Sequence, residues 1–177
     1  NPAARAAIDG WRKSYRGDPS GFKHAVGRWH WADKDVDKAL AAFDVPFVAT
    51  QAGTHLAIDH AHVLLLKADR SAASRILSPA LDEASAKGLT DLELLAHLVA
   101  GAIAPGPDAE WQETVRRARA SPWMELSLMC LALDGHRWLN LGEPENARRS
   151  FTDLHSRAHN LGDELKISVA NLGLRRC

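Results

Sequence analysis

The chain has 177 residues, of which 46% are hydrophobic and 25% charged, and its 22 Lys and Arg balance 22 Asp and Glu. This is typical of one folded domain or a stack of small repeats, and the absence of a basic excess disfavours a nucleic-acid partner. No run of about 18 apolar residues predicts a membrane span, and two cysteines exclude a disulfide scaffold, so we expect a cytoplasmic protein without a cofactor.

Helices are predicted along the whole chain, and they are separated by Gly, Pro and capping residues. Strand signals are almost absent, and the segment VPFVAT at 45–50 is interpreted as an extended connection around Pro46. Helices of about 10–18 residues joined by short loops are typical of antiparallel helical hairpins. The expected ranges are 3–16, 21–31, 34–43, 54–67, 72–87, 91–104, 109–120, 123–141, 145–160 and a last helix from residue 164.

One spacing occurs three times: a small residue, an Ala twelve positions later, and a large apolar residue four positions after that. The first two Ala are 34 residues apart, and the second and third are 74 apart, which is two units of 37. In the hairpin between them, Trp111 or a neighbour stands where Ala is expected. The small residues allow two helices to approach closely, and the large residue fills the space between stacked hairpins. The three sets are Gly27, Ala39 and Phe43; Ala61, Ala73 and Leu77; and Gly135, Ala147 and Phe151.

These residues resemble the tetratricopeptide repeat family. The best unit is LALDGHRWLNLGEPENARRSFTDLHSRAHNLGD at 131–163, which also has an aromatic residue at Trp138, and VANLG at 169–173 is similar to the opening of another unit. The long second helix is similar to the longer-helix repeats of bacterial multidomain regulators. The resemblance implies an all-α solenoid of antiparallel hairpins with a right-handed superhelix. Residues 21–177 would form this repeat domain, with a truncated last repeat, and residues 1–20 a capping or linker segment.

In this family the first helix of each hairpin lines a concave groove, and such grooves bind a peptide or protein segment. We therefore expect a binding module that performs no catalysis. It would serve as the ligand-sensing, regulatory or scaffold part of a larger protein, of a kind found in bacteria. Uncapped terminal repeats would also favour a homodimer. Matching Ala61 to the small position implies that the groove contains His24, Arg28, Trp31, His55, Ile58, His62, Leu65, Leu66, His136, Leu139 and Asn140.

A metal site is the alternative interpretation of the histidine-rich segment GTHLAIDHAHV at 53–63. His55, Asp59 and His62 follow each other at positions i, i+4 and i+7, which lie on one face of a helix. Two histidines and a carboxylate can bind zinc, so a small metal-dependent enzyme or metal-binding domain is the competing function. The repeat spacing favours the groove, and we expect neither a bound metal nor catalytic residues.

Overall fold

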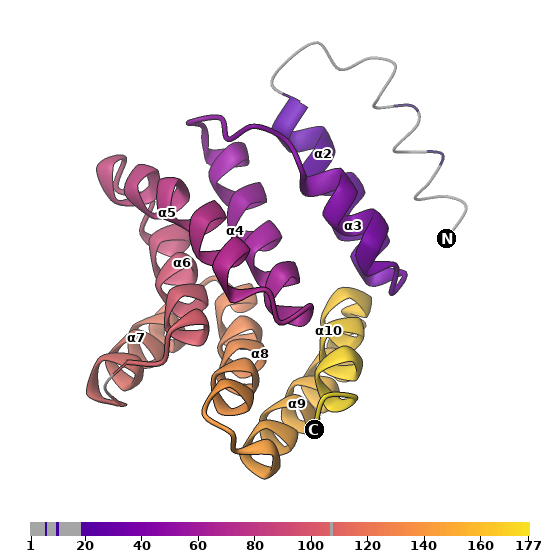
Figure 1. Cartoon of the computed structure of the whole chain (residues 1–177), viewed down its shortest axis with the longest axis vertical. Coiled ribbons are helices and arrows are strands. Elements are labelled where there is room, and N and C mark those ends of the chain that lie inside the picture. The colour runs from indigo at the N-terminus through magenta and orange to yellow at the C-terminus, as the bar shows by residue number, and fades with distance from the viewer. Residues whose placement is uncertain (1–5, 7–9, 11–18, 107) are drawn as a thin grey trace.

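The chain is all-helical in the computed structural model, which describes residues 6, 10, 19–106 and 108–177 (Figure 1). Within these residues there is no strand, and the segment 44–50 around Pro46 is non-helical, as expected. Each helix expected from residue 21 onward is present, whereas the expected helix 3–16 lies almost entirely outside the described residues. The helices are α2 (Pro19–Ala32), α3 (Val36–Phe43), α4 (Gln51–Leu66), α5 (Arg70–Ala86), α6 (Thr90–Ile103), α7 (Asp108–Ala120), α8 (Met124–Asn140), α9 (Pro144–Leu161) and α10 (Glu164–Leu174).

Capping residues and turn residues define the helix ends. Asp69 caps α5, because its carboxylate accepts a 3.0 Å hydrogen bond from the backbone N–H of Ala72. Pro144 occupies the first turn of α9, where its missing N–H costs nothing. Gly162 ends the same helix with a φ of 67°, a conformation that favours glycine. None of the described helices is both long and apolar enough to cross a membrane.

Consecutive helices pack as pairs, and the repeated spacing marks the points of closest approach. A Cβ atom on Gly27 would lie 2.1 Å from the ring of Phe43, so only glycine allows α2 to sit on that ring. The same arrangement joins α8 to α9, where a Cβ on Gly135 would lie 2.6 Å from the ring of Phe151. Gly173 of α10 also packs on the Phe151 ring, because a Cβ added to Gly173 would lie 2.4 Å from that ring. The spacing thus identifies where aromatic rings pack directly on glycine backbone.

We expect Gly135→Ala to lower the free energy of unfolding by up to about 2 kcal/mol, because overpacking costs about 1–3 kcal/mol and the better helix propensity of Ala returns about 1. Urea unfolding measures this change. The matched background is Phe151→Leu, which opens space beside Gly135. In that background the same Gly135→Ala substitution should cost nothing or stabilise, and an equal cost in both backgrounds would contradict the packing argument.

The first helices of the pairs pack on one another in a closed series. Helix α2 packs on α4, α4 on α6, α6 on α8 and α8 on α10, and α10 packs back on α2 (Figure 1). Two long-range hydrogen bonds hold the C-terminal part of the described chain against α2 and α4. The Ser168 hydroxyl donates to the carbonyl of Trp31 at 2.9 Å, and the Arg176 guanidinium donates to the carbonyl of Leu65 at 2.7 Å. The inner faces of these helices therefore pack against each other as core.

The closure also covers the last helix. Leu165, Val169 and Ala170 of α10 are buried in one apolar cluster with Trp31 of α2 and Leu128 of α8. The sequence suggested that a truncated last repeat would leave its apolar face open for a second copy of the chain. That face is instead covered within the chain, so α10 does not offer the apolar surface on which the homodimer expectation was based.

Candidate functional site

Six of the eleven residues expected in a groove are buried, so they do not line an exposed surface. His62 shows the reason, because its ring packs edge-on against Trp31 at 4.9 Å and against His136 at 5.4 Å between ring centroids. An open superhelix would leave these rings exposed, whereas the closed contact of α10 with α2 places them inside. The prediction of an open groove is therefore wrong at the buried residues Trp31, Ile58, His62, Leu65, Leu66 and His136.

The other five expected groove residues are partly exposed and lie in two places. Leu139 and Asn140 are at the end of α8, where the Asn140 amide donates to the carbonyl of Ala102 at 2.5 Å. His24, Arg28 and His55 lie together around Asp59, as described next. The residues expected at structural positions of the repeat are buried, except for Trp138, which is half-buried. The buried residues are Gly27, Ala39, Phe43, Ala61, Ala73, Leu77, Gly135, Ala147 and Phe151.

A polar cluster forms where α2 crosses α4. His24 Nε2 is 2.8 Å from Asp59 Oδ2, and the rings of His24 and His55 are 4.4 Å apart. Burial alone would raise the pKa of Asp59, but Arg28 and the hydrogen bond with His24 outweigh it and hold that pKa well below its usual range. Burial also lowers the pKa of His55 to about 4. The cluster therefore holds an ionised carboxylate beside a neutral imidazole.

The structure changes one of the three candidate ligands of the alternative metal site. The sequence grouped His55 and Asp59 with His62, whereas the structure brings His24, His55 and Asp59 together, with one potential ligand atom from each within 4.8 Å of the others. The His62 ring lies instead in the buried edge-on contacts described above. The spacing i, i+4 from a single helix gave two of the three residues, and the third comes from α2.

Beyond this cluster, a chain of ion pairs links α4, α2, α8 and α10. Arg28 lies 3.7 Å from Asp59 and donates a 2.5 Å hydrogen bond to Glu125. Glu125 also accepts a 2.9 Å hydrogen bond from Lys166, whose side chain is 1% exposed. Burial alone would raise the pKa of Glu125, but Lys166 and then Arg28 pull it below its usual value. These charges compensate each other and join the first and last described helices.

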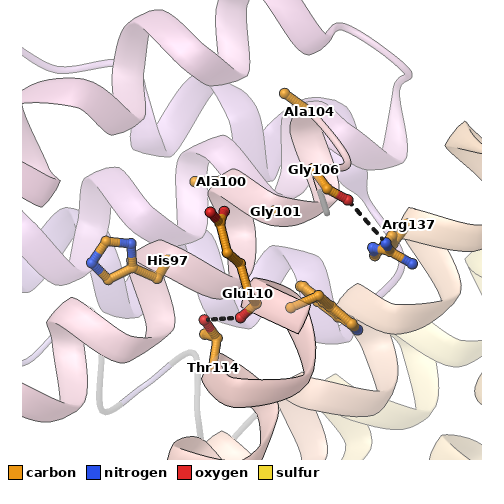
Figure 2. A pocket seen from close by; sticks show the side chains of 9 residues that line it. His97, Ala100, Gly101, Ala104, Gly106, Glu110, Thr114 and Arg137 are labelled. Carbon is orange, nitrogen blue, oxygen red and sulfur yellow. Dashed lines mark hydrogen bonds between the residues drawn. The ribbon is translucent and has the colours of Figure 1, made fainter. Parts of the chain in front are cut away.

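A cavity of about 330 Å³ lies between α6, α7 and the end of α8 (Figure 2). Small residues of α6, namely Ala100, Gly101 and Ala104, leave the space open on one side. Trp111 of α7 forms another wall and is so close that a Cβ on Gly101 would lie 2.8 Å from its ring. The remaining lining residues are His97, Gly106, Glu110, Thr114 and Arg137.

Arg137 is the unusual member of this cavity because it is a cation only 3% exposed. Its guanidinium carbon lies 5.5 Å from the Trp111 ring centroid and 5.7 Å from that of Trp138, which is a cation–π arrangement. One terminal nitrogen donates to Asp108 at 2.6 Å and to the carbonyl of Gly106 at 3.3 Å. Its Nε is buried and has no hydrogen-bond partner in the described part of the chain.

Asp134 fixes the two tryptophans on either side of Arg137. Its carboxylate accepts hydrogen bonds from the indole N–H of Trp111 at 3.2 Å and of Trp138 at 3.0 Å, and from the hydroxyl of Ser150 at 2.7 Å. In the sequence, neither Asp134 nor Arg137 stands out as a candidate site residue. The available signal was the spacing Asp134, Arg137, Trp138, which places an acid, a base and an aromatic residue on one face of a helix.

Comparison with protein-family models, curated proteins and solved structures gives no match. The resemblance to tetratricopeptide repeats is therefore a prediction that rests on the spacing of the residues alone.

Proposed function

We propose that this chain is a non-catalytic binding module that holds a segment of a partner protein in the cavity between α6 and α7. The observation that carries the proposal is the buried guanidinium of Arg137 with its unpartnered Nε at a cavity of about 330 Å³. A buried polar atom without a partner costs about 1–3 kcal/mol. The Nε has almost no accessible surface, so the guanidinium would have to turn toward the cavity before a ligand oxygen could accept from it and recover this cost. Binding sites are typically apolar cavities with a few fixed polar groups, which describes this one.

The lining indicates what would enter. The side formed by Ala100, Gly101 and Ala104 offers room without polarity, and the Trp111 ring offers a flat apolar wall. One apolar side chain of an inserted peptide would fill this space, while a backbone carbonyl or carboxylate would accept from Arg137. Asp108 already pairs with Arg137, so a neutral carbonyl suits the site better than a second carboxylate. A peptide segment is thus favoured over a small acid.

A helical-repeat interaction protein fits this site, although the site differs from the one expected. The tetratricopeptide resemblance, the regulatory or scaffold role in a larger protein and the cytoplasmic location belong to the same proposal. Its support is the repeated spacing and the cavity, because the inner faces of the first helices are occupied by core packing.

Selection from a library of random peptides displayed on phage tests this proposal. We expect enriched peptides whose affinity falls at least about tenfold in Ala100→Leu, because the added side chain occupies the cavity. Ala41→Leu is the matched control, since Ala41 is an exposed position of α3 and does not line the cavity. Thr114→Leu narrows the same cavity from α7. If both Ala100→Leu and Thr114→Leu weaken peptide binding, a local distortion of one helix cannot explain the loss of affinity.

Arg137→Lys tests the polar end of the cavity. Lysine keeps the charge but lacks the Nε–H donor, and we expect weaker binding of the selected peptides with the helical circular dichroism unchanged. The proposal is wrong if no peptide is enriched, or if the enriched peptides bind Ala100→Leu and Thr114→Leu as tightly as they bind the wild-type protein.

A further inference from the structure

We propose that His24, His55 and Asp59 bind a divalent transition-metal ion, for which Zn²⁺ is the best match. Two imidazoles and one carboxylate are zinc ligands, and three protein ligands with a fourth position open to water are a common zinc arrangement. One potential ligand atom from each residue lies within 4.8 Å of the other two. This site lies on α2 and α4 and is separate from the cavity at Arg137.

His55 gives the second, independent observation. Its Nε2 is buried, yet no hydrogen-bond partner for it exists among the residues that the structure describes. The ring is held in place by His24 at 4.4 Å and by an edge-on contact with Trp123 at 5.7 Å between centroids. A fixed imidazole with an unsatisfied buried nitrogen is costly unless that nitrogen finds a partner, and a metal ion beside Asp59 would supply one.

The side chains of the cluster would have to adjust to reach coordination geometry, because their ligand atoms lie within 4.8 Å of one another. Bonds of about 2.0–2.2 Å from a tetrahedral ion place neighbouring ligand atoms roughly 3.4 Å apart. His24 Nε2 and Asp59 Oδ2, now 2.8 Å apart, would have to separate by roughly half an ångström to admit the ion. The His24 side chain is 15% exposed and Asp59 is 3% exposed, so the ion would enter from the His24 side.

Arg28 opposes the metal and thereby provides a test. Its guanidinium lies 3.7 Å from Asp59, where a second cation would be repelled. The shorter contact of Arg28 is with Glu125, at 2.5 Å, so this arginine keeps a partner when Asp59 turns to a metal. Replacing Arg28 by glutamine should therefore tighten metal binding, whereas a purely structural His24–Asp59 pair would give no such gain.

The experiment is a calorimetric titration of the chelator-treated full chain with Zn²⁺, repeated with Co²⁺ while its visible absorption is followed. We expect one ion per chain and a tetrahedral Co²⁺ spectrum. His24→Ala and His55→Ala should each weaken Zn²⁺ binding at least about tenfold. His62→Leu should leave it unchanged, and Arg28→Gln should strengthen it. Circular dichroism of each variant shows that the fold is retained, and His24→Gln is the second variant should His24→Ala unfold.

Two results would overturn the proposal. The first is the absence of one-to-one Zn²⁺ binding in both the wild-type chain and Arg28→Gln. The second is binding that survives His24→Ala and His55→Ala but is lost in His159→Ala, because the stacked rings of His155 and His159, 6.3 Å apart on α9, are the competing pair. Cavity-blocking Ala100→Leu should not change the Zn²⁺ affinity, so this site and the peptide cavity can fail independently.

Discussion

Acidification from pH 7 to pH 5 should lower the free energy of unfolding by about 2 kcal/mol through the buried His62, and the buried His136 should add a loss of the same sign. Burial lowers the pKa of His62 to about 3, and burial, with a smaller contribution from His62, holds the pKa of His136 well below its usual value. Both side chains are at most 1% exposed. The folded protein therefore keeps the His62 imidazole neutral at pH 5 and disfavours a charge on His136.

The sign follows from the unfolded chain, in which each histidine binds a proton near pH 6.5. Between pH 6.5 and the lowered folded pKa the unfolded state binds more protons, so stability decreases as the pH falls. At about 1.4 kcal/mol per pH unit, the 1.5 units between pH 6.5 and pH 5 give about 2 kcal/mol for His62, and the lowered pKa values of His136 and His55 add losses in the same direction. The carboxylates Asp59 and Glu125 have lowered pKa values, so their stabilising contributions are lost only below about pH 4.

Urea unfolding at pH 7 and pH 5, in the presence of chelator, measures the effect. In His62→Leu the difference between the two pH values should shrink by about 2 kcal/mol, because one titrating group has been removed. The control is His159→Leu, at an exposed position of α9, which should keep the full difference. An unchanged difference in His62→Leu would show that His62 titrates normally in the folded protein.

The same variant should also stabilise the protein at pH 7. Both ring nitrogens of His62 are buried without a partner in the part of the chain that is described, and leucine of similar volume removes this cost of about 1–3 kcal/mol. A loss of stability at pH 7 would instead mean that the edge-on contacts of His62 with Trp31 and His136 contribute more than its unsatisfied nitrogens cost.

The order and the approximate limits of the helices could be predicted because local residues encode them. Gly162 and Pro144 mark helix ends through backbone conformations that depend on neighbouring residues alone. The Gly27 and Gly135 spacings were also readable, since a ring four residues after an Ala packs on the preceding helix of the same pair. These are contacts over short stretches of chain, and sequence patterns report them well.

What the sequence could not show is the contact of α10 with α2. The bond from Ser168 to Trp31 spans 137 residues, and no repeat spacing encodes whether a stack of helices closes or stays open. This one feature changed the predicted groove into core and buried His62 and His136. The cavity at Arg137 was missed for a related reason, because it depends on how far α7 stands from the small residues of α6.

Glu125 takes part in the ion pairs that link α2, α8 and α10, and Glu125→Ala should lower the free energy of unfolding by about 3–5 kcal/mol. Its carboxylate pairs with Lys166, which is 1% exposed, and also with Arg28. Removing it leaves a buried ammonium uncompensated, and breaking a buried pair from one side is far more costly than the net value of the pair. Urea unfolding at pH 7 measures this loss.

Lys166→Met is the informative partner variant. The apolar side chain fills the same space, and Glu125 keeps the 2.5 Å hydrogen bond from Arg28, so this change should cost much less than Glu125→Ala. In the Lys166→Met background, Glu125→Ala should lose a large part of its cost, because no ammonium remains to be left unpaired. Glu113→Ala, which breaks an exposed pair with Arg116 on α7, is the matched control and should change stability little. Equal losses for Glu125→Ala with and without Lys166 would show that the loss does not come from leaving the Lys166 ammonium without its α8 partner.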